Sequence, residues 1–253
     1  MANTRTILCI KWGSLFTPQE VNILYRACAD HLSDPLRFVC VSDTPDGLDP
    51  AIEFRPIPDI GLSQADIKRP GVWRKLSLYH SDLHDLGPVL FIDLDMVVTG
   101  PLAHFFDRPD QVTFLDTGPA WRPKPRAGSR EAGTGLFTFD PAREAHILKD
   151  FLADPAHHMA TTRNEQDFVS ARLQDHGFWP DGAVVSFKRH LCWRYGIGMV
   201  RKPVQPAPET SVVAFHGTPR PSDTFQNRVW GPAPHWHLGQ VPWLASYMDK
   251  YGG

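Results

Sequence analysis

The 253-residue sequence has few cysteines, and none of them forms a C-x-x-C pair. The four are Cys9, Cys28, Cys40 and Cys192. Three of them lie inside apolar runs, where a small buried thiol is the ordinary explanation. The cysteines therefore predict a protein of a reducing compartment and give no sign of a zinc site.

The sequence also lacks a long hydrophobic run and an excess of charge of one sign. Its first apolar stretch reaches Lys11 too soon for a secretory signal, and no later run approaches the ~18 apolar residues of a membrane span. Lys and Arg number 26 against 28 for Asp and Glu, so the net charge of -2 does not favour a nucleic acid partner. We expect a cytoplasmic protein with no transmembrane segment, and contact with the inner face of a membrane stays open.

What the chain has instead is an alternation of apolar, strand-like runs with helix signals. Strands are predicted at Thr6–Ile10, Leu36–Ser42, Ile52–Ile57 and from Val89, and helices from Thr17 and at Val72–Leu86, Pro141–Ala153, Glu165–Asp175 and Val241–Lys250. Thr17, Pro18 and Glu20 form a capping-box start for the first helix. The alternation predicts a single α/β domain with a mostly parallel central sheet flanked by helices.

Two carboxylates interrupt the most apolar strand, in the stretch PVLFIDLDMVVTGPL. Asp93 and Asp95 fall where open sheets bind ligands, at the carboxyl end of a strand. Residues at i and i+2 of a regular strand point to opposite sides, so the chain must bend for both carboxylates to serve one ion. Oxygen ligands select Mg²⁺ or Mn²⁺, with a nucleotide diphosphate as co-ligand. The other reading is that the two aspartates only cap a turn.

The segment FIDLDMVVTGPL closely resembles the D-x-D segment of metal-dependent glycosyltransferases with the GT-A fold, especially the family 8-like group. Other landmarks follow in the expected order. VWRKLSLYHSDL takes the place of the helix whose basic residue contacts the donor, with Lys75 as our choice and Arg74 as the alternative. AGTGLFTFDP resembles the small-residue strand beside the donor sugar. NEQDFV resembles the D-Q-D segment, which implies Asp167 as the polar group near the anomeric carbon.

A last landmark, VVAFHGTPRP, is similar to the C-terminal H-x-x-G-x-x-K-P-W segment of that family. The resemblance implies His216 as a third metal ligand beside Asp93 and Asp95, and Gly217 and Arg220 as donor contacts. The His-to-Gly spacing is shorter here, Arg220 stands where the family has lysine, and the Trp after the proline is absent. A neutral imidazole suits Mn²⁺ better than Mg²⁺, so we expect manganese.

Two further features have a functional and a plain structural interpretation. Trp12 follows the first strand, where an open sheet binds its base, and either stacks on a nucleotide or belongs to the core. The loop Thr117–Gly133 is either an acceptor-binding lid or a solvated loop. It carries one acidic residue, Glu131, and the basic residues Arg122, Lys124, Arg126 and Arg130.

The resemblance implies transfer of a sugar from a nucleotide diphosphate sugar, a UDP-sugar by preference, to a hydroxyl of a glycan or glycolipid acceptor, with retention of configuration. Residues 1–100 would form the nucleotide-binding half and residues 101–253 the acceptor and catalytic half. Asp167 and Asp95 would be the catalytic carboxylates. One alternative is a haloacid-dehalogenase-type phosphatase with Asp93 as nucleophile and Asp95 as acid and base. Another is a nucleotide-sugar-binding protein without turnover.

Overall fold

The structure is a computed structural model and describes residues 4–121, 130–173, 175–225 and 227–252. The basic residues Arg122, Lys124 and Arg126 of the loop singled out above lie outside the described residues. In this described part of the chain, no helix combines the length and the apolar character needed to cross a membrane.

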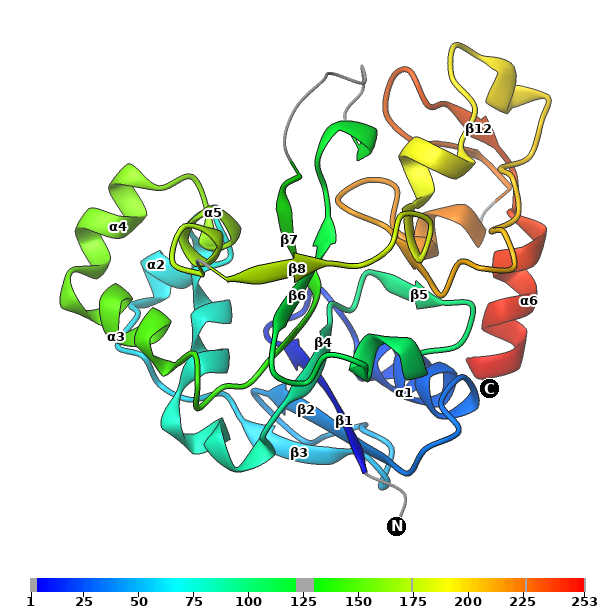
Figure 1. Cartoon of the computed structure of the whole chain (residues 1–253). Helices are drawn as coiled ribbons and strands as arrows, with labels where there is room; N and C mark the ends of the chain where they lie inside the picture. Colours follow the sequence, from blue (N-terminus) through cyan, green and yellow to red (C-terminus); the bar gives the residue numbers. More distant parts are fainter. Residues whose placement is uncertain (1–3, 122–129, 174, 226, 253) are drawn as a thin grey trace.

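A seven-stranded sheet forms the centre of the molecule (Figure 1). Its strands, in spatial order, are β3 (Glu53–Pro56), β2 (Leu36–Ser42), β1 (Arg5–Lys11), β4 (Val89–Ile92), β7 (Ala132–Phe139), β6 (Val112–Asp116) and β8 (His176–Phe178). All pairs are parallel except those of β7, which runs antiparallel to both β4 and β6. The predicted fold class, a single α/β domain with a mostly parallel sheet, is confirmed.

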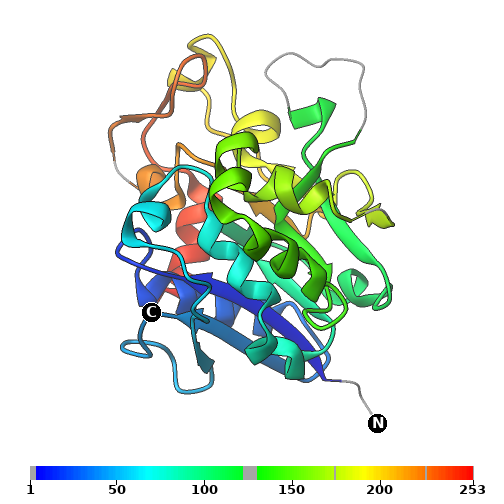
Figure 2. The same ribbon diagram turned by 90° about the vertical axis from the view of Figure 1, so that its left-hand side faces the viewer.

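Helices cover both faces of this sheet, because successive side chains of a strand point to opposite faces. Ile7 and Cys9 of β1 pack into the cluster that contains α1 (Pro18–Asp30), whereas Leu8 and Ile10 pack into the cluster on the other face. Figure 1 shows α1 and α6 (Pro242–Tyr251) on one side. The other side, which faces the viewer in Figure 2, holds α2 (Gln64–Lys68), α3 (Ala145–Ala153), α4 (Pro155–Thr161) and α5 (Glu165–Ser170).

Two small sheets complete the fold. The first has the order β5 (Met96–Val98), β10 (Val212–Ala214), β9 (Val184–Ser186), and the second pairs β11 (Val229–Trp230) with β12 (His237–Leu238). The chain leaves the large sheet after Ile92 and enters the β5 sheet at Met96. Asp93 and Asp95 therefore lie in the short link between two sheets.

The prediction of one continuous helix at Val72–Leu86 is wrong. The structure has two 3₁₀ helices there, η1 (Trp73–Tyr79) and η2 (Ser81–Leu86). His80 separates them with an extended backbone, and its side chain accepts a hydrogen bond from the Asp82 backbone N–H, so it caps η2. A local side-chain cap has outcompeted continuation of one long helix.

Candidate active site

The D-x-D segment bends as the spacing required. The backbone N–H of Asp93 donates to the Gly135 carbonyl at 2.9 Å, which extends the β4–β7 pairing by one residue. A turn follows, closed by the Met96 N–H bonded to the Asp93 carbonyl at 3.1 Å. This turn stands at the carboxyl end of β4, beside β1, where the strand order of the sheet reverses.

The pairing of β5 with β10 brings His216 to the same place. The two strands are antiparallel with Ala214 opposite Met96, and the Phe215 N–H donates to the Asp95 carbonyl at 2.8 Å. The residue after the end of β10 therefore lies beside the residue before the start of β5. The residue after β10 is Phe215, and His216, the next along the chain, lines the same cavity as the two aspartates.

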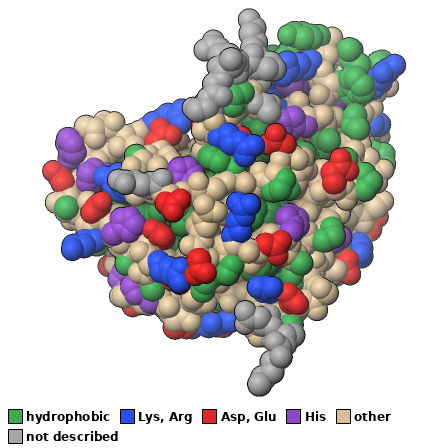
Figure 3. All heavy atoms as spheres, in the orientation of Figure 1, with side chains coloured by type: hydrophobic (Ala, Val, Ile, Leu, Met, Phe, Trp, Pro, Cys, Tyr) green, Lys and Arg blue, Asp and Glu red, His purple; other side chains and the backbone are tan. Residues whose placement is uncertain are grey.

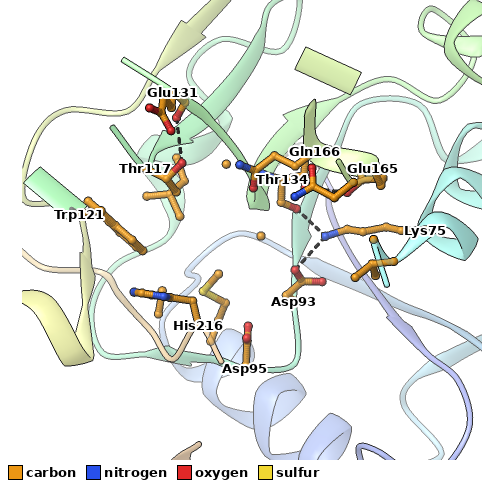
Figure 4. A pocket seen from close by; sticks show the side chains of 18 of the residues that line it. Lys75, Asp93, Asp95, Thr117, Trp121, Glu131, Thr134, Glu165, Gln166 and His216 are labelled. Atoms are coloured by element: carbon orange, nitrogen blue, oxygen red, sulfur yellow. Dashed lines mark hydrogen bonds and ion pairs between the residues drawn. The ribbon is translucent and has the colours of Figure 1, made fainter. Parts of the chain in front are cut away.

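Two adjoining cavities open at this turn, and both are lined by Val72, Asp93 and Asp95. The larger has a volume of about 420 Å³, and Figure 4 shows its polar side chains converging from several elements. Those labelled are Lys75, Asp93, Asp95, Thr117, Trp121, Glu131, Thr134, Glu165, Gln166 and His216. The smaller, about 280 Å³, is lined by Trp12, Gly217 and Arg220 among other residues. A divided cleft of this kind has room for two parts of one ligand.

A buried ammonium group anchors the first aspartate. Lys75 Nζ donates to Asp93 Oδ2 at 2.8 Å and to the Thr134 carbonyl at 2.7 Å, and its side chain is 4% exposed (Figure 4). Arg74, the alternative, pairs instead with Asp43 at 3.0 Å and lines neither cavity. Of the two basic residues, Lys75 is the one that faces the site.

The second aspartate carries an unfavourable charge. Burial, followed by the like charge of Asp93, raises the pKa of Asp95 to about 7, although Lys75 and Arg220 oppose the shift. Burial also raises the pKa of Asp93, against the opposing effect of Lys75. Two carboxylates and one direct ammonium partner leave a demand for further positive charge in the cavity.

His216 is held as a neutral imidazole. Its Nε2 lies 2.6 Å from Ser186 Oγ, and the Trp121 ring centroid is 5.2 Å from its own. Burial, reinforced by the positive charges of Lys188 and Arg189, lowers the pKa of His216 to about 4. A neutral ring is the form that can bind a metal.

These donors suit a divalent cation in chemical type. Asp93 and Asp95 supply oxygens next to uncompensated charge, and His216 supplies a neutral nitrogen. Within the described residues, however, no three His, Cys, Asp or Glu side chains are close enough together to enclose an ion. An ion bound here would therefore need further oxygen ligands, such as water or the phosphate groups of a bound molecule, as is usual for Mg²⁺ and Mn²⁺.

In the NEQDFV segment, the residues that line the larger cavity are not the predicted Asp167. Glu165 and Gln166 line the cavity, whereas Asp167 does not, and its Oδ1 accepts a hydrogen bond from Arg163 at 2.7 Å. Asn164 caps α5, so Asp167 stands about 200° around the helix from Glu165 and faces away. The predicted start at Glu165 agrees with the structure, but the face of α5 that meets the cleft is set by long-range contacts such as that of Glu165 with Thr134.

Glu165 is a buried carboxyl group that sequence reasoning missed. Its Oε2 accepts a hydrogen bond from the Thr134 hydroxyl at 2.9 Å, while its Oε1 has no partner. Burial raises the pKa of Glu165 to about 7, although Lys75 opposes the shift. Asp93, Lys75, Thr134 and Glu165 therefore form one connected polar wall.

No family model and no curated protein matches the chain by sequence. Solved structures do match it. A structure of an active-site mutant of LgtC aligns over 97% of this chain and 95% of its own, with 10% identity and a TM-score of 0.61. A structure of galactosyltransferase LgtC with donor and acceptor sugar analogs aligns over 97% of this chain and 96% of its own, with 10% identity and a TM-score of 0.59. The glycosyltransferase GlyE of Streptococcus pneumoniae TIGR4 is 13% identical with a TM-score of 0.59, and 96% of this chain covers 60% of GlyE. The chain has the GT-A fold of these transferases.

Proposed function

We propose that the protein is a glycosyltransferase that moves a sugar from a nucleotide diphosphate sugar to an acceptor hydroxyl. The observation that carries the proposal is the divided cleft at Asp93 and Asp95. The smaller cavity offers the Trp12 ring and the Arg220 guanidinium, which suit a base and a diphosphate. The larger offers carboxyl and amide groups, which suit sugar hydroxyls. A donor lying across both would place its sugar–phosphate bond beside the two aspartates.

In this arrangement Arg220 supplies positive charge toward the departing diphosphate. Lys75 offsets the negative charge of Asp93, to which it donates a hydrogen bond. Asp93, Asp95 and His216 would share Mn²⁺, or Mg²⁺ as the alternative, with oxygens of the donor diphosphate, because the three side chains are not close enough together to enclose it alone. The ion would supply Lewis-acid stabilisation of the same leaving group. UDP is the donor nucleotide that the resemblance implies, and retention is the stereochemistry that it implies.

The sugar end of the cleft belongs to α5. Glu165 and Gln166 are the polar groups of this helix in the cavity, and we propose that they bind the transferred sugar. Asp167 becomes a positioning residue, because its ion pair holds Arg163, which lines the cavity. The acceptor we propose is a glycan or glycolipid hydroxyl entering past Trp121.

The phosphatase alternative is not favoured by the fold. Its nucleophile motif follows the first strand of its sheet, whereas Asp93 follows the fourth strand along this chain, and the sheet is that of a GT-A protein. A binding protein without turnover would keep the same cleft, so only an activity measurement separates it from an enzyme.

The test is thermal unfolding with UDP, GDP or CDP, each with Mn²⁺, Mg²⁺ or EDTA, followed by release of the free nucleotide from its sugar donor. Binding to the folded state alone raises the midpoint. We expect a shift that needs both a nucleotide and a divalent ion, and that is lost in Asp95→Asn but kept in Asp249→Asn, an exposed carboxylate on α6. No shift with any nucleotide would refute the proposal. A shift without nucleotide release would identify a binding protein.

A further inference from the structure

Exposed hydrophobic side chains are concentrated in one region, far along the chain from the D-x-D turn. Eight of the eleven large hydrophobic residues found exposed in the described ranges form what we call the apolar patch: Tyr195, Ile197, Met199, Val200, Val204, Val229, Trp236 and Leu238. Figure 3 shows hydrophobic and basic side chains together at the upper right, where Figure 1 draws β12. Contiguous exposed apolar surface of this kind marks an interaction site.

The patch is one surface, although it comes from two segments. The Tyr195 N–H donates to the Pro234 carbonyl at 2.9 Å, and Lys202 Nζ donates to the Leu238 carbonyl at 2.8 Å. Trp193 Nε1 also donates to the Lys202 carbonyl at 3.0 Å. Residues 193–204 are thereby fastened to the β11–β12 hairpin.

Two members of the patch are almost fully exposed to solvent. Val200 is 86% exposed and Tyr195 is 79% exposed. Tyr195 has a φ of 55°, in the left-handed region that a bulky residue adopts only at a cost of ~1 kcal/mol or more. The Tyr195 N–H bond to the Pro234 carbonyl fixes this conformation, which leaves the aromatic ring exposed to solvent.

Cations outnumber carboxylates around the patch. Residues 187–208 contain no Asp or Glu but carry the cations Lys188, Arg189, Arg194, Arg201 and Lys202. Residues 224–248, which include the hairpin, also contain no Asp or Glu, and their one cation, Arg228, pairs with Asp223 at 3.9 Å. The whole chain has a net charge of -2, so this local excess is not a consequence of a basic composition. The partner must accept apolar side chains and supply negative charge.

The basic segment begins at the active-site cleft. Lys188 Nζ donates to the His216 carbonyl at 2.9 Å, and Arg189 lines the larger cavity. The chain then runs directly into the apolar patch. A partner seated on the patch would therefore lie close to the cleft.

We propose that the apolar patch docks on a membrane surface that contains anionic lipids. Tyr195 and Trp236 suit the boundary between headgroups and acyl chains, where amphipathic rings are favoured. Val200 and Met199 would enter the acyl region, and Arg201 and Lys202 would contact lipid phosphates. Docking itself does not depend on the enzymatic activity. That the sugar acceptor is a glycolipid of this membrane is a consequence that does rest on the proposed function.

The test is sedimentation of the full chain with vesicles of phosphatidylcholine, alone or with one-third phosphatidylglycerol, at low and high salt. We expect binding to the anionic vesicles that weakens with salt. Arg201→Glu with Lys202→Glu should lower the affinity on the order of tenfold or more, since each cation near the surface contributes ~1 kcal/mol. Val200→Ser with Tyr195→Ser should lower it as well and should leave the unfolding temperature nearly unchanged, as should Arg201→Glu alone, which lowers the affinity while sparing the Lys202–Leu238 hydrogen bond.

The matched control lies on α3, where Leu152 and Lys149 are also exposed. Leu152→Ser with Lys149→Glu should bind vesicles like the unaltered protein. If the control variant lost as much vesicle affinity as the patch variants, or if the unaltered protein bound neither vesicle type, the proposal would be overturned. A lipid-independent dimer that is lost in Val200→Ser would also overturn it and assign the patch to a second copy of the chain. Nucleotide release from the donor in solution, measured in parallel, separates failure of docking from failure of the proposed activity.

Discussion

Replacing Lys75 with methionine tests how the wall of the cleft is held together. Methionine keeps most of the buried side-chain volume but removes the ammonium that bonds Asp93 and the Thr134 carbonyl. Breaking a fully buried ion pair by removing one partner costs about 3–5 kcal/mol. The Asp93 side chain is 32% exposed, so water relieves part of that cost. We therefore expect Lys75→Met to lower the free energy of unfolding by about 2–3 kcal/mol.

The neighbouring cation provides a matched control. Arg74 pairs with Asp43 at 3.0 Å, but the two side chains are 23% and 38% exposed. Ion pairs in contact with solvent contribute about 0–1 kcal/mol. Arg74→Met should therefore lower the free energy of unfolding by less than about 1 kcal/mol, although Arg74 and Lys75 are adjacent residues of η1.

Equilibrium unfolding in urea, with the slope against denaturant unchanged, measures both values. Asp93→Asn provides the second arm of a double-mutant cycle, in which Lys75→Met should cost less than it does in the unaltered protein. If Lys75→Met and Arg74→Met agreed within about 0.5 kcal/mol, burial would not be what makes the Lys75 contact important, and the reasoning would be refuted.

Three further substitutions probe the same region. Burial raises the pKa of Glu165 from 4.5 to about 7, so its stabilising protonated form is fully present below pH 4.5 and is lost as the pH rises through 7. Glu165→Gln should reduce the fall in the free energy of unfolding between these pH values, measured by urea titrations across that window, while Asp95, whose pKa is also raised to about 7, keeps its own share. In Gly135→Ala the new methyl would lie 2.6 Å from the flexible end of Met96, so we expect a loss under about 1 kcal/mol by urea unfolding and a weaker nucleotide-dependent thermal shift. In Gly100→Ala the new methyl would lie 2.8 Å from the backbone oxygen of Thr210, which cannot move aside easily. Urea unfolding should therefore show a free energy of unfolding lower by about 1–3 kcal/mol, while the nucleotide-dependent thermal shift is retained.

Local patterns were enough to predict the sheet and the position of the D-x-D turn. The apolar run into Asp93 and Asp95 could only be a strand that ends at a charged, ligand-facing turn, and the capping box at Thr17 fixed the start of α1. His80 was different, because a side-chain cap that divides a helix competes with an equally good helical pattern.

The remaining features depend on geometry that a single sequence does not contain. The entry of His216 into the cavity of the two aspartates depends on the pairing of β10 with β5, which is a long-range contact. The start of α5 at Glu165 was predicted correctly, but the choice between Glu165 and Asp167 depends on which face of the helix packs against Thr134 and the cleft, which is a long-range contact. That the three expected metal ligands enter one cavity is visible only in the folded chain, and their roles remain predictions.

The link between the two sheets at Asp93–Met96 also has a consequence for dynamics. The Asp95 carbonyl accepts a hydrogen bond from the Phe215 N–H, directly after β10 of the small sheet, while Asp93 extends the pairing of β4 with β7 in the large sheet. A donor that contacts both aspartates and His216 would hinder the separation of the two sheets. We therefore expect slower amide hydrogen exchange in β10 when donor nucleotide is present, because opening of that small sheet would then require release of the ligand.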